Sequence, residues 1–296
     1  MTISDFCSLV DANSNFIITT HLSPDPDGLG AEIGLYYALK QKNKKVKIIN
    51  SMPYSTRYGF MDPENCIEYV SPSTKTILLD PSWKIILLDT NDVNFIGPIS
   101  EFIGASMERL YIVDHHDISF DNSNLLILPD YSSTCEIIYE ILQKLKIEPD
   151  PIGASALLTG IVYDTGSFAY SKTSIRTFEA ASALFRYGAN PTYIHSKLYE
   201  SSDISVLLLK KSVLSTLELH HNNMISVLTL TQEALRGAKA EFEDANDIIN
   251  LPLQSEVVQI SIFFKQESKA STRCSLRSKG IINVASIAQD FGGGGH

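Results

Sequence analysis

Four short segments of the chain combine carboxylate and imidazole side chains. They are HLSPDPDG with His21, Asp25 and Asp27, ILLDT with Asp89, VDHHD with Asp114, His115 and His116, and IVYDTG with Asp164. Imidazole and carboxylate ligands without thiolate suit Mn²⁺, Mg²⁺, Co²⁺ or Zn²⁺. Two such ions about 3.5–4 Å apart can activate a water and hold both oxygens of a displacement. Six ligands, His21, Asp25, Asp27, Asp89, His115 and Asp164, would supply two such sites.

Each cluster also has a structural interpretation. Asp25 or Asp27 could cap a helix that begins at residue 28, because Asp is a favourable N-cap residue. Asp89 alone could be a turn residue, and two adjacent histidines could lie on the surface. Asp164 follows an apolar helical pattern, where an unpaired carboxylate is costly, so it needs a partner. The four clusters together favour a metal site over four independent structural roles.

The elements that must position these residues alternate along the first 190 residues. Apolar runs at 15–20, 44–50, 83–90 and 109–117 predict strands, and helical spacing at 28–43, 133–147, 151–166 and 174–188 predicts helices. This alternation predicts an α/β fold with a mostly parallel, doubly wound sheet. Ligands of such sheets bind outside the carboxyl ends of the strands. Three of the four clusters follow strands, so we expect them to converge there.

The pattern changes after residue 190. Residues 191–219 begin with Pro191 and then have helical periodicity, which predicts a helical connector. Strand-like runs at 223–231, 256–266 and 271–278, with helical stretches near 232–250 and 283–291, predict a smaller α/β domain. The expected organisation is therefore a catalytic domain at 1–190, the connector at 191–219 and a second domain at 220–296, with a cleft between the domains.

Composition limits the classes of partner. The net charge of −10 argues against a surface that binds long duplex DNA, although bound cations can still attract small phosphate ligands. No apolar run approaches the roughly 20 residues of a membrane span, and the first residues do not resemble a signal peptide. The 4 cysteines are far apart in the sequence, as expected of reduced thiols in a cytoplasmic protein.

Specific motifs resemble those of a known family. HLSPDPDGLG, LLDT, DHH and YDTGSF, in this order, resemble the four motifs of the DHH phosphoesterases. SLRSKGIINVASIAQDFGGGGH resembles the DHHA1 substrate-binding domain that accompanies one branch of that family. SSTCEIIYEIL and GANPTYIHSKLYE resemble the stand-alone nano-RNases and 3′-phosphoadenosine-5′-phosphate (pAp) phosphatases of this branch. The resemblance covers essentially the whole chain.

The resemblance implies a role for each residue of the metal site. One ion would be held by His21, Asp25 and Asp89, and the second by Asp27, Asp89, His115 and Asp164, with Asp89 as the bridge. His116 would lie beside the scissile phosphate and stabilise charge or protonate the leaving oxygen. Asp114 would orient the histidines. The implied cofactors are two divalent cations, Mn²⁺ first and Mg²⁺ or Co²⁺ as alternatives.

In the second domain the resemblance implies substrate-binding residues. Arg277 would make bidentate contacts to a phosphate. Gly293, Gly294 and Gly295 would allow close approach of the backbone, and His296 would contact the substrate. Three departures stand out: Pro26 between the two aspartates, Ala169 after DTGSF, and the absence of residues after GGGGH, which implies a domain truncated at this motif.

The predicted function is two-metal-dependent hydrolysis of phosphoester bonds in short oligoribonucleotides, in pAp, or in both. An alternative is a phosphodiesterase for pApA, the linear product of a cyclic dinucleotide. A family II pyrophosphatase would require a different second domain. An alternative of another class is a non-catalytic nucleotide-binding sensor, against which the retention of every expected metal ligand argues. Partners would be short RNA or small nucleotides, without a membrane, and a homodimer is plausible for the family.

Overall fold

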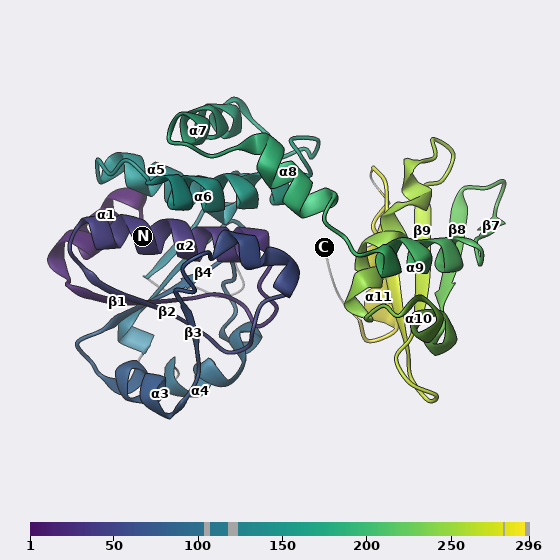
Figure 1. Ribbon diagram of the computed structural model, residues 1–296, viewed down its shortest axis with the longest axis horizontal. Helices are drawn as coiled ribbons and strands as arrows, with labels where there is room; N and C mark the ends of the chain where they lie inside the picture. Colours follow the sequence, from purple (N-terminus) through teal and green to yellow (C-terminus); the bar gives the residue numbers. More distant parts are fainter. Residues whose placement is uncertain (104–106, 118–123, 281, 294–296) are drawn as a thin grey trace. The chain divides into compact units, whose positions relative to one another are not determined.

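The structure is a computed structural model that describes residues 1–103, 107–117, 124–280 and 282–293 (Figure 1). The chain forms two compact units, Met1–Ser201 and Ser202–His296. The division between the units falls within the segment 191–219 that the sequence predicts as a connector. Among the described residues, no helix combines the length and the hydrophobicity needed to cross a bilayer.

The first unit is built on a six-stranded sheet in which every pair of neighbours is parallel. Its spatial order is β3-β2-β1-β4-β5-β6. The strands are β1 (Asn15–Thr19), β2 (Lys45–Asn50), β3 (Ile67–Tyr69), β4 (Lys84–Leu88), β5 (Leu110–Asp114) and β6 (Leu125–Ile127). The predicted mostly parallel sheet is thus confirmed. The central strands are continuous apolar runs because both of their faces are covered.

Helices cover both faces of this sheet (Figure 1). One face packs against α1 (Ile3–Ala12), α2 (Pro26–Gln41), α5 (Thr134–Lys144) and α6 (Pro151–Asp164), and the other against α3 (Pro72–Leu79) and α4 (Ser100–Ile103). Side chains alternate between the two cores, because Phe16 and Ile18 of β1 join the first and Ile17 joins the second. Helices α7 (Ile175–Arg186) and α8 (Pro191–Tyr199) complete the unit.

The second unit contains a mixed four-stranded sheet of order β10-β9-β8-β7. Its elements are α9 (Ile204–Leu214), β7 (Glu218–His220), β8 (Ile225–Leu230), α10 (Gln232–Ala238), β9 (Ile260–Gln266), β10 (Thr272–Ser278) and α11 (Val284–Asp290). Strands β8 and β9 are parallel, whereas the pairs β7–β8 and β9–β10 are antiparallel. Its core is formed by Leu209 and Val213 of α9 against Leu228, Leu230 and Phe263 of the sheet.

Short 3-10 turns connect several elements. They are Thr56–Met61, Val93–Ile99, Met107–Arg109, Glu243–Asn250 and Pro252–Gln254.

The topology of the first sheet matters most for function. Strands β1, β4 and β5 are adjacent at its centre, so the segments that follow them lie at one edge of the sheet. The start of α2 and the end of α6 complete the same region.

Candidate active site

The carboxyl edge of the first sheet gathers the acidic and histidine residues that the sequence singles out. Asp89 directly follows β4, while Asp114 ends β5. Possible ligand atoms lie within 4.8 Å of one another in three groups, which are His21 with Asp25 and Asp89, Asp27 with His115 and Asp164, and Asp89 with Asp114, His115 and His116. All eight residues of the predicted metal and catalytic set are therefore neighbours.

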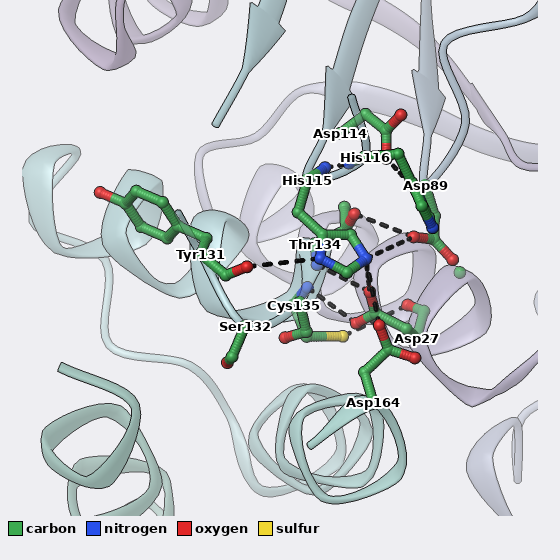
Figure 2. A network of polar contacts seen from close by, with 12 residues as sticks. Asp27, Asp89, Asp114, His115, His116, Tyr131, Ser132, Thr134, Cys135 and Asp164 are labelled. Atoms are coloured by element: carbon green, nitrogen blue, oxygen red, sulfur yellow. Dashed lines mark hydrogen bonds and ion pairs between the residues drawn. The ribbon is translucent and has the colours of Figure 1, made fainter. Parts of the chain in front are cut away.

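His115 lies at the centre of this cluster (Figure 2). Its Nε2 atom is 3.0 Å from Asp164 Oδ2, 3.7 Å from Asp89 Oδ1 and 3.8 Å from Asp27 Oδ2. The three carboxylates come from the end of α6, the end of β4 and the start of α2. Elements that are distant in the sequence thus direct three anionic groups at one ring nitrogen.

Asp89 joins this arrangement to a second one around His21. His21 Nε2 is 3.6 Å from Asp89 Oδ2 and 4.0 Å from Asp25 Oδ1. Each carboxylate oxygen of Asp89 therefore faces a different histidine. The backbone of Asp89 has φ 60°, in the left-handed region that residues other than glycine rarely adopt. Strain of this kind concentrates at functional sites.

The carboxylate of Asp27 is held by the first turn of α5. Its oxygens accept hydrogen bonds from the amides of Thr134 (2.7 Å) and Cys135 (2.9 Å). These amides have no partner within the helix, and the helix dipole favours a negative group at this end. The Thr134 hydroxyl donates to Asp89 Oδ1 at 3.0 Å. One helix terminus therefore fixes two of the predicted metal ligands.

Asp25 has a structural role as well. It is the N-cap of α2, and its Oδ1 accepts hydrogen bonds from the amides of Asp27 (2.9 Å) and Gly28 (3.2 Å). The capping interpretation and the metal-ligand interpretation are compatible, because a carboxylate has a second oxygen.

The tautomer of His115 follows from its surroundings. Its Nδ1 lies 3.4 Å from the carbonyl oxygen of Tyr131, which can only accept, so Nδ1 carries a proton. Among the described residues, the buried Nε2 then has no hydrogen-bond donor. A lone pair that faces three carboxylates requires a positive charge, either a proton or a metal ion. This donor set fits a divalent cation.

The electrostatics of the clustered side chains support the same conclusion. Burial raises the pKa of Asp27 to about 6, and the nearby Asp164 adds to the effect. Burial, with the charge of neighbouring carboxylates, raises the pKa of Asp89 well above its usual value. Burial alone would lower the pKa of His115, but the close contact with the Asp164 carboxylate and the charge of Asp27 raise it to about 9. A bound cation would relieve this repulsion.

The carboxylate of Asp114 forms hydrogen bonds with its neighbours and does not point at the Nε2 atom of His115. It accepts hydrogen bonds from the His115 amide (2.8 Å), from His116 Nδ1 (2.8 Å) and from Asn91 Nδ2 (2.7 Å). Burial raises its pKa, but the hydrogen bond and charge of His116 outweigh burial, and the net shift is downward. The His116 side chain is 39% exposed, against 5% for His115. A partly exposed imidazole that a carboxylate orients is suited to proton transfer.

The predicted substrate-binding residues belong to the second unit. Arg277 is exposed on β10, where it pairs in register with Ser261, and its side chain has no ion-pair partner among the described residues. The amide of Gly293 donates to the carbonyl of Ala288 at 2.8 Å. Gly294, Gly295 and His296 lie outside the described residues.

Several residues of this network have no role that the sequence predicts. They are the hydrogen-bond partners of Asp114, His115 and Asp27, namely Asn91, Tyr131, Thr134 and Cys135. A signal was present for the last two. The pattern Ser133-x-x-Glu136 before an apolar run is typical of a helix start, where free amides attract a carboxylate. Tyr131 acts through its backbone carbonyl, for which a side-chain pattern gives no signal.

Comparison with known proteins places this geometry in context. Residues 15–161 match the model of the DHH family, N-terminal domain. The chain is 29% identical over 281 residues to the bifunctional oligoribonuclease and PAP phosphatase NrnA of Thermus thermophilus, covering 94% of this chain and 81% of that protein. It is also 29% identical over 310 residues to the cyclic-di-AMP phosphodiesterase GdpP of Bacillus subtilis, covering 97% of this chain but 44% of that protein.

Solved structures share the fold of this chain. A crystal structure of an exopolyphosphatase-related protein from Bacteroides fragilis superposes with a TM-score of 0.93 at 26% identity, over 99% of this chain and 88% of that one. A putative family II inorganic pyrophosphatase from Methanococcus jannaschii shares the fold, with a TM-score of 0.52 at 18% identity, over 89% of this chain and 87% of that one. The motifs, the clustered ligands and the sequence relatives agree with the matching model, and residues 15–161 form a domain of the DHH family.

Proposed function

We propose that the protein is a divalent-metal-dependent phosphoesterase that hydrolyses short oligoribonucleotides and pAp. The observation that supports this most strongly is the arrangement around His115, whose buried Nε2 faces three carboxylates and has no donor among the described residues. Asp89 faces His21 with its other oxygen, which supports a second ion beside the first.

The residues divide into two ligand sets with distinct positions. His21, Asp25 and Asp89 would hold one cation, and Asp27, Asp89, His115 and Asp164 the other. Such a pair, when bound, lowers the pKa of a water and neutralises charge on a phosphoryl group. Mn²⁺ is the proposed ion, because it accepts both imidazole and carboxylate ligands.

His116, oriented by Asp114, would donate a proton to the leaving group. Asp114 accepts a hydrogen bond from His116 Nδ1 and so fixes the orientation of the ring. The imidazole would then present Nε2 to the leaving oxygen and donate a proton to it as the ester bond breaks. The carboxylate of Asp114 would stabilise the protonated ring before this transfer, as its lowered pKa indicates.

The substrate class is supported by the relatives and by charge. Several relatives that align over nearly the whole chain are named as oligoribonucleases and PAP phosphatases. The net charge of −10 opposes tight binding of long duplexes. The relation to GdpP favours pApA as a second candidate substrate.

One panel of substrates tests this proposal. The full-length protein with Mn²⁺ is incubated with labelled RNA of two to five nucleotides, with pAp and with pApA, and kcat/KM is measured for each. We expect turnover of short RNA and pAp, with slower hydrolysis of pApA. A clear preference for pApA would support the second candidate, and binding without turnover of any substrate would support a nucleotide sensor.

A further inference from the structure

The segment 130–135 positions the metal site without contributing a metal ligand. The carbonyl of Tyr131 accepts the hydrogen bond from His115 Nδ1, and the amides of Thr134 and Cys135 hold Asp27 (Figure 2). The Thr134 hydroxyl also reaches Asp89. Three of the proposed ligands therefore depend on where this short segment lies.

Glu136 holds the segment from inside the protein. Its side chain is 1% exposed. The Oε2 atom accepts hydrogen bonds from the Ser132 amide (3.0 Å), from the Ser132 hydroxyl and from the Thr177 hydroxyl (3.1 Å). The Oε1 atom accepts from Arg176 Nε at 2.6 Å. Because it has this many donors, the buried carboxylate is held in one position and restrains the groups that bind it.

Arg176, in the first turn of α7, contacts the same segment through its guanidinium. Its Nη2 donates to the carbonyl of Asp130 at 2.8 Å. Its guanidinium lies 3.5 Å from the centre of the Tyr131 ring, within the range of a cation–π contact. The pair thus contacts three consecutive residues, Asp130 through its carbonyl, Tyr131 through its ring and Ser132 through its amide and hydroxyl.

The two contacts differ from an ordinary helix cap. Ser133 is the N-cap of α5, and Glu136 occupies the position whose side chain usually returns to the N-cap amide. Here Glu136 reaches past Ser133 to the amide of Ser132 and joins Arg176 of another helix. The contact therefore ties the loop before α5 to α7 and fixes more than the helix end.

We propose that Glu136 and Arg176 are positioning residues for the metal centre. Through segment 130–135 they set the tautomer and place of His115 and the direction of the amides that hold Asp27. This inference rests on the metal-binding part of the proposed function. It predicts that weakening the pair lowers metal affinity while the fold and the chemical step remain.

The test compares two variants with matched controls on α7. Glu136→Gln keeps the shape of the side chain but replaces one acceptor by a donor that opposes Arg176. Arg176→Lys keeps the charge but loses the planar guanidinium, which donates to both Glu136 and the Asp130 carbonyl and stacks on Tyr131. Glu179→Gln and Arg186→Lys make the same changes at exposed positions of α7. Mn²⁺ dissociation constants of the metal-free proteins are measured by titration calorimetry, with thermal unfolding as the check of folding.

We expect Mn²⁺ to bind about 10-fold or more weakly to each of the two variants, as is usual when partners of metal ligands are lost. The controls should bind like the wild type. With saturating Mn²⁺, kcat and KM for a short RNA should return to within about 2-fold to 3-fold of the wild type. Arg176→Lys carries the test by itself if Glu136→Gln does not fold.

Three results would overturn the inference in distinguishable ways. Wild-type Mn²⁺ affinity in the folded variants would remove the positioning role and leave the proposed function standing. Absence of Mn²⁺ binding by the wild type would remove both, because no metal centre would then need positioning. A loss of kcat that excess Mn²⁺ does not restore would also contradict the inference, since the defect would then lie in chemistry.

Discussion

At the scale of single residues, the carboxylates of the site are arranged for binding at the expense of stability. Burial and neighbouring carboxylates raise the pKa of Asp89, and burial, with the nearby Asp164, raises that of Asp27. The left-handed backbone at Asp89 adds a further cost. Groups that are unfavourable in the empty protein become favourable once a cation is bound, which is the usual conflict between function and stability.

Asp89→Asn separates the effect of this carboxylate on stability from its effect on metal binding. Asn tolerates the left-handed conformation and can still accept the hydrogen bond from the Thr134 hydroxyl, but it removes one buried negative charge. In EDTA the variant should be more stable than the wild type by about 1 kcal/mol or more in chemical denaturation. Its Mn²⁺-dependent turnover should fall by roughly 10³-fold or more. A variant that is less stable than the wild type in EDTA would refute the electrostatic argument.

Glu32 gives a prediction about pH that does not involve the metal ligands. It is buried on α2, its Oε2 accepts a hydrogen bond from Asn50 at 3.0 Å, and burial raises its pKa from 4.5 to about 8. Between these values the folded state holds a proton that the unfolded state releases, so stability falls as pH rises. Denaturation of wild type and Glu32→Gln at pH 5 and pH 8 checks this.

The wild type should lose stability relative to Glu32→Gln over that range, at up to about 1.4 kcal/mol per pH unit. The comparison isolates Glu32, because the other titrating groups are common to both proteins. A constant difference in the free energy of unfolding between the two pH values would show that Glu32 has an ordinary pKa.

At the scale of elements, the site depends on how closely α2, α5 and α6 approach one another. Gly160 of α6 makes this possible, because a Cβ there would lie 2.3 Å from Cys135 Sγ and 2.8 Å from Asp27 Oδ1. Any larger residue at this position would push the start of α5 or the carboxylate of Asp27 out of place.

Gly160→Ala should therefore reduce stability by about 1–3 kcal/mol and weaken Mn²⁺ binding. Gly237→Ala in α10 is the matched control, since nothing lies within 4 Å of a Cβ at that position. In the control, removal of a helical glycine should raise stability by about 0.5–1 kcal/mol. Chemical denaturation and metal titration of both variants test the prediction. Equal effects of the two substitutions would contradict the close-packing argument.

The elements that the sequence predicts are those with long, regular patterns. Strands β1, β4 and β5 read as continuous apolar runs, so their number and parallel arrangement could be predicted. Strands β3, β6 and β7 have three residues each, too few to show a periodicity. The helical stretch predicted near 232–250 is divided, because Lys239 adopts φ 55° and ends α10.

The candidate site was predictable where side chains determine it and hidden where the backbone does. Asp25, Asp89 and His115 stand in motifs at strand ends, where the carboxyl-edge rule brings them together. The Tyr131 carbonyl and the amides at the start of α5 complete the site, but any residue has these groups. Their positions follow from tertiary packing, which one sequence does not reveal.

At the scale of the whole molecule, the candidate metal-site residues and the candidate substrate-binding arginine lie in different units. The clustered carboxylates and histidines lie in the first unit, whereas Arg277 lies on β10 of the second. The resemblance to DHHA1 domains predicts that Arg277 binds a substrate phosphate. We therefore expect the first unit to perform the chemistry and the second to contribute affinity.

Arg277→Ala should raise KM for short RNA by about 10-fold to 100-fold and leave kcat and the Mn²⁺ affinity nearly unchanged, because a charge-assisted contact to the substrate is lost. Arg273→Ala on the same strand is the control, since Arg273 pairs with Glu267 at 2.7 Å and stacks on Phe242. Steady-state kinetics of both variants decide the matter. An unchanged KM in Arg277→Ala would remove this residue from substrate binding.

The central claim is that the protein hydrolyses phosphoester bonds in short RNA with the help of divalent cations, which Asp89 and the neighbouring ligands would hold. The most direct measurement follows mononucleotide release from labelled RNA of two to five nucleotides during a Mn²⁺ titration, for the wild type and Asp89→Ala. We predict no release in EDTA, release that rises with Mn²⁺ for the wild type, and no release by Asp89→Ala at any Mn²⁺ concentration. Release in EDTA, or substantial turnover by Asp89→Ala, would contradict the account.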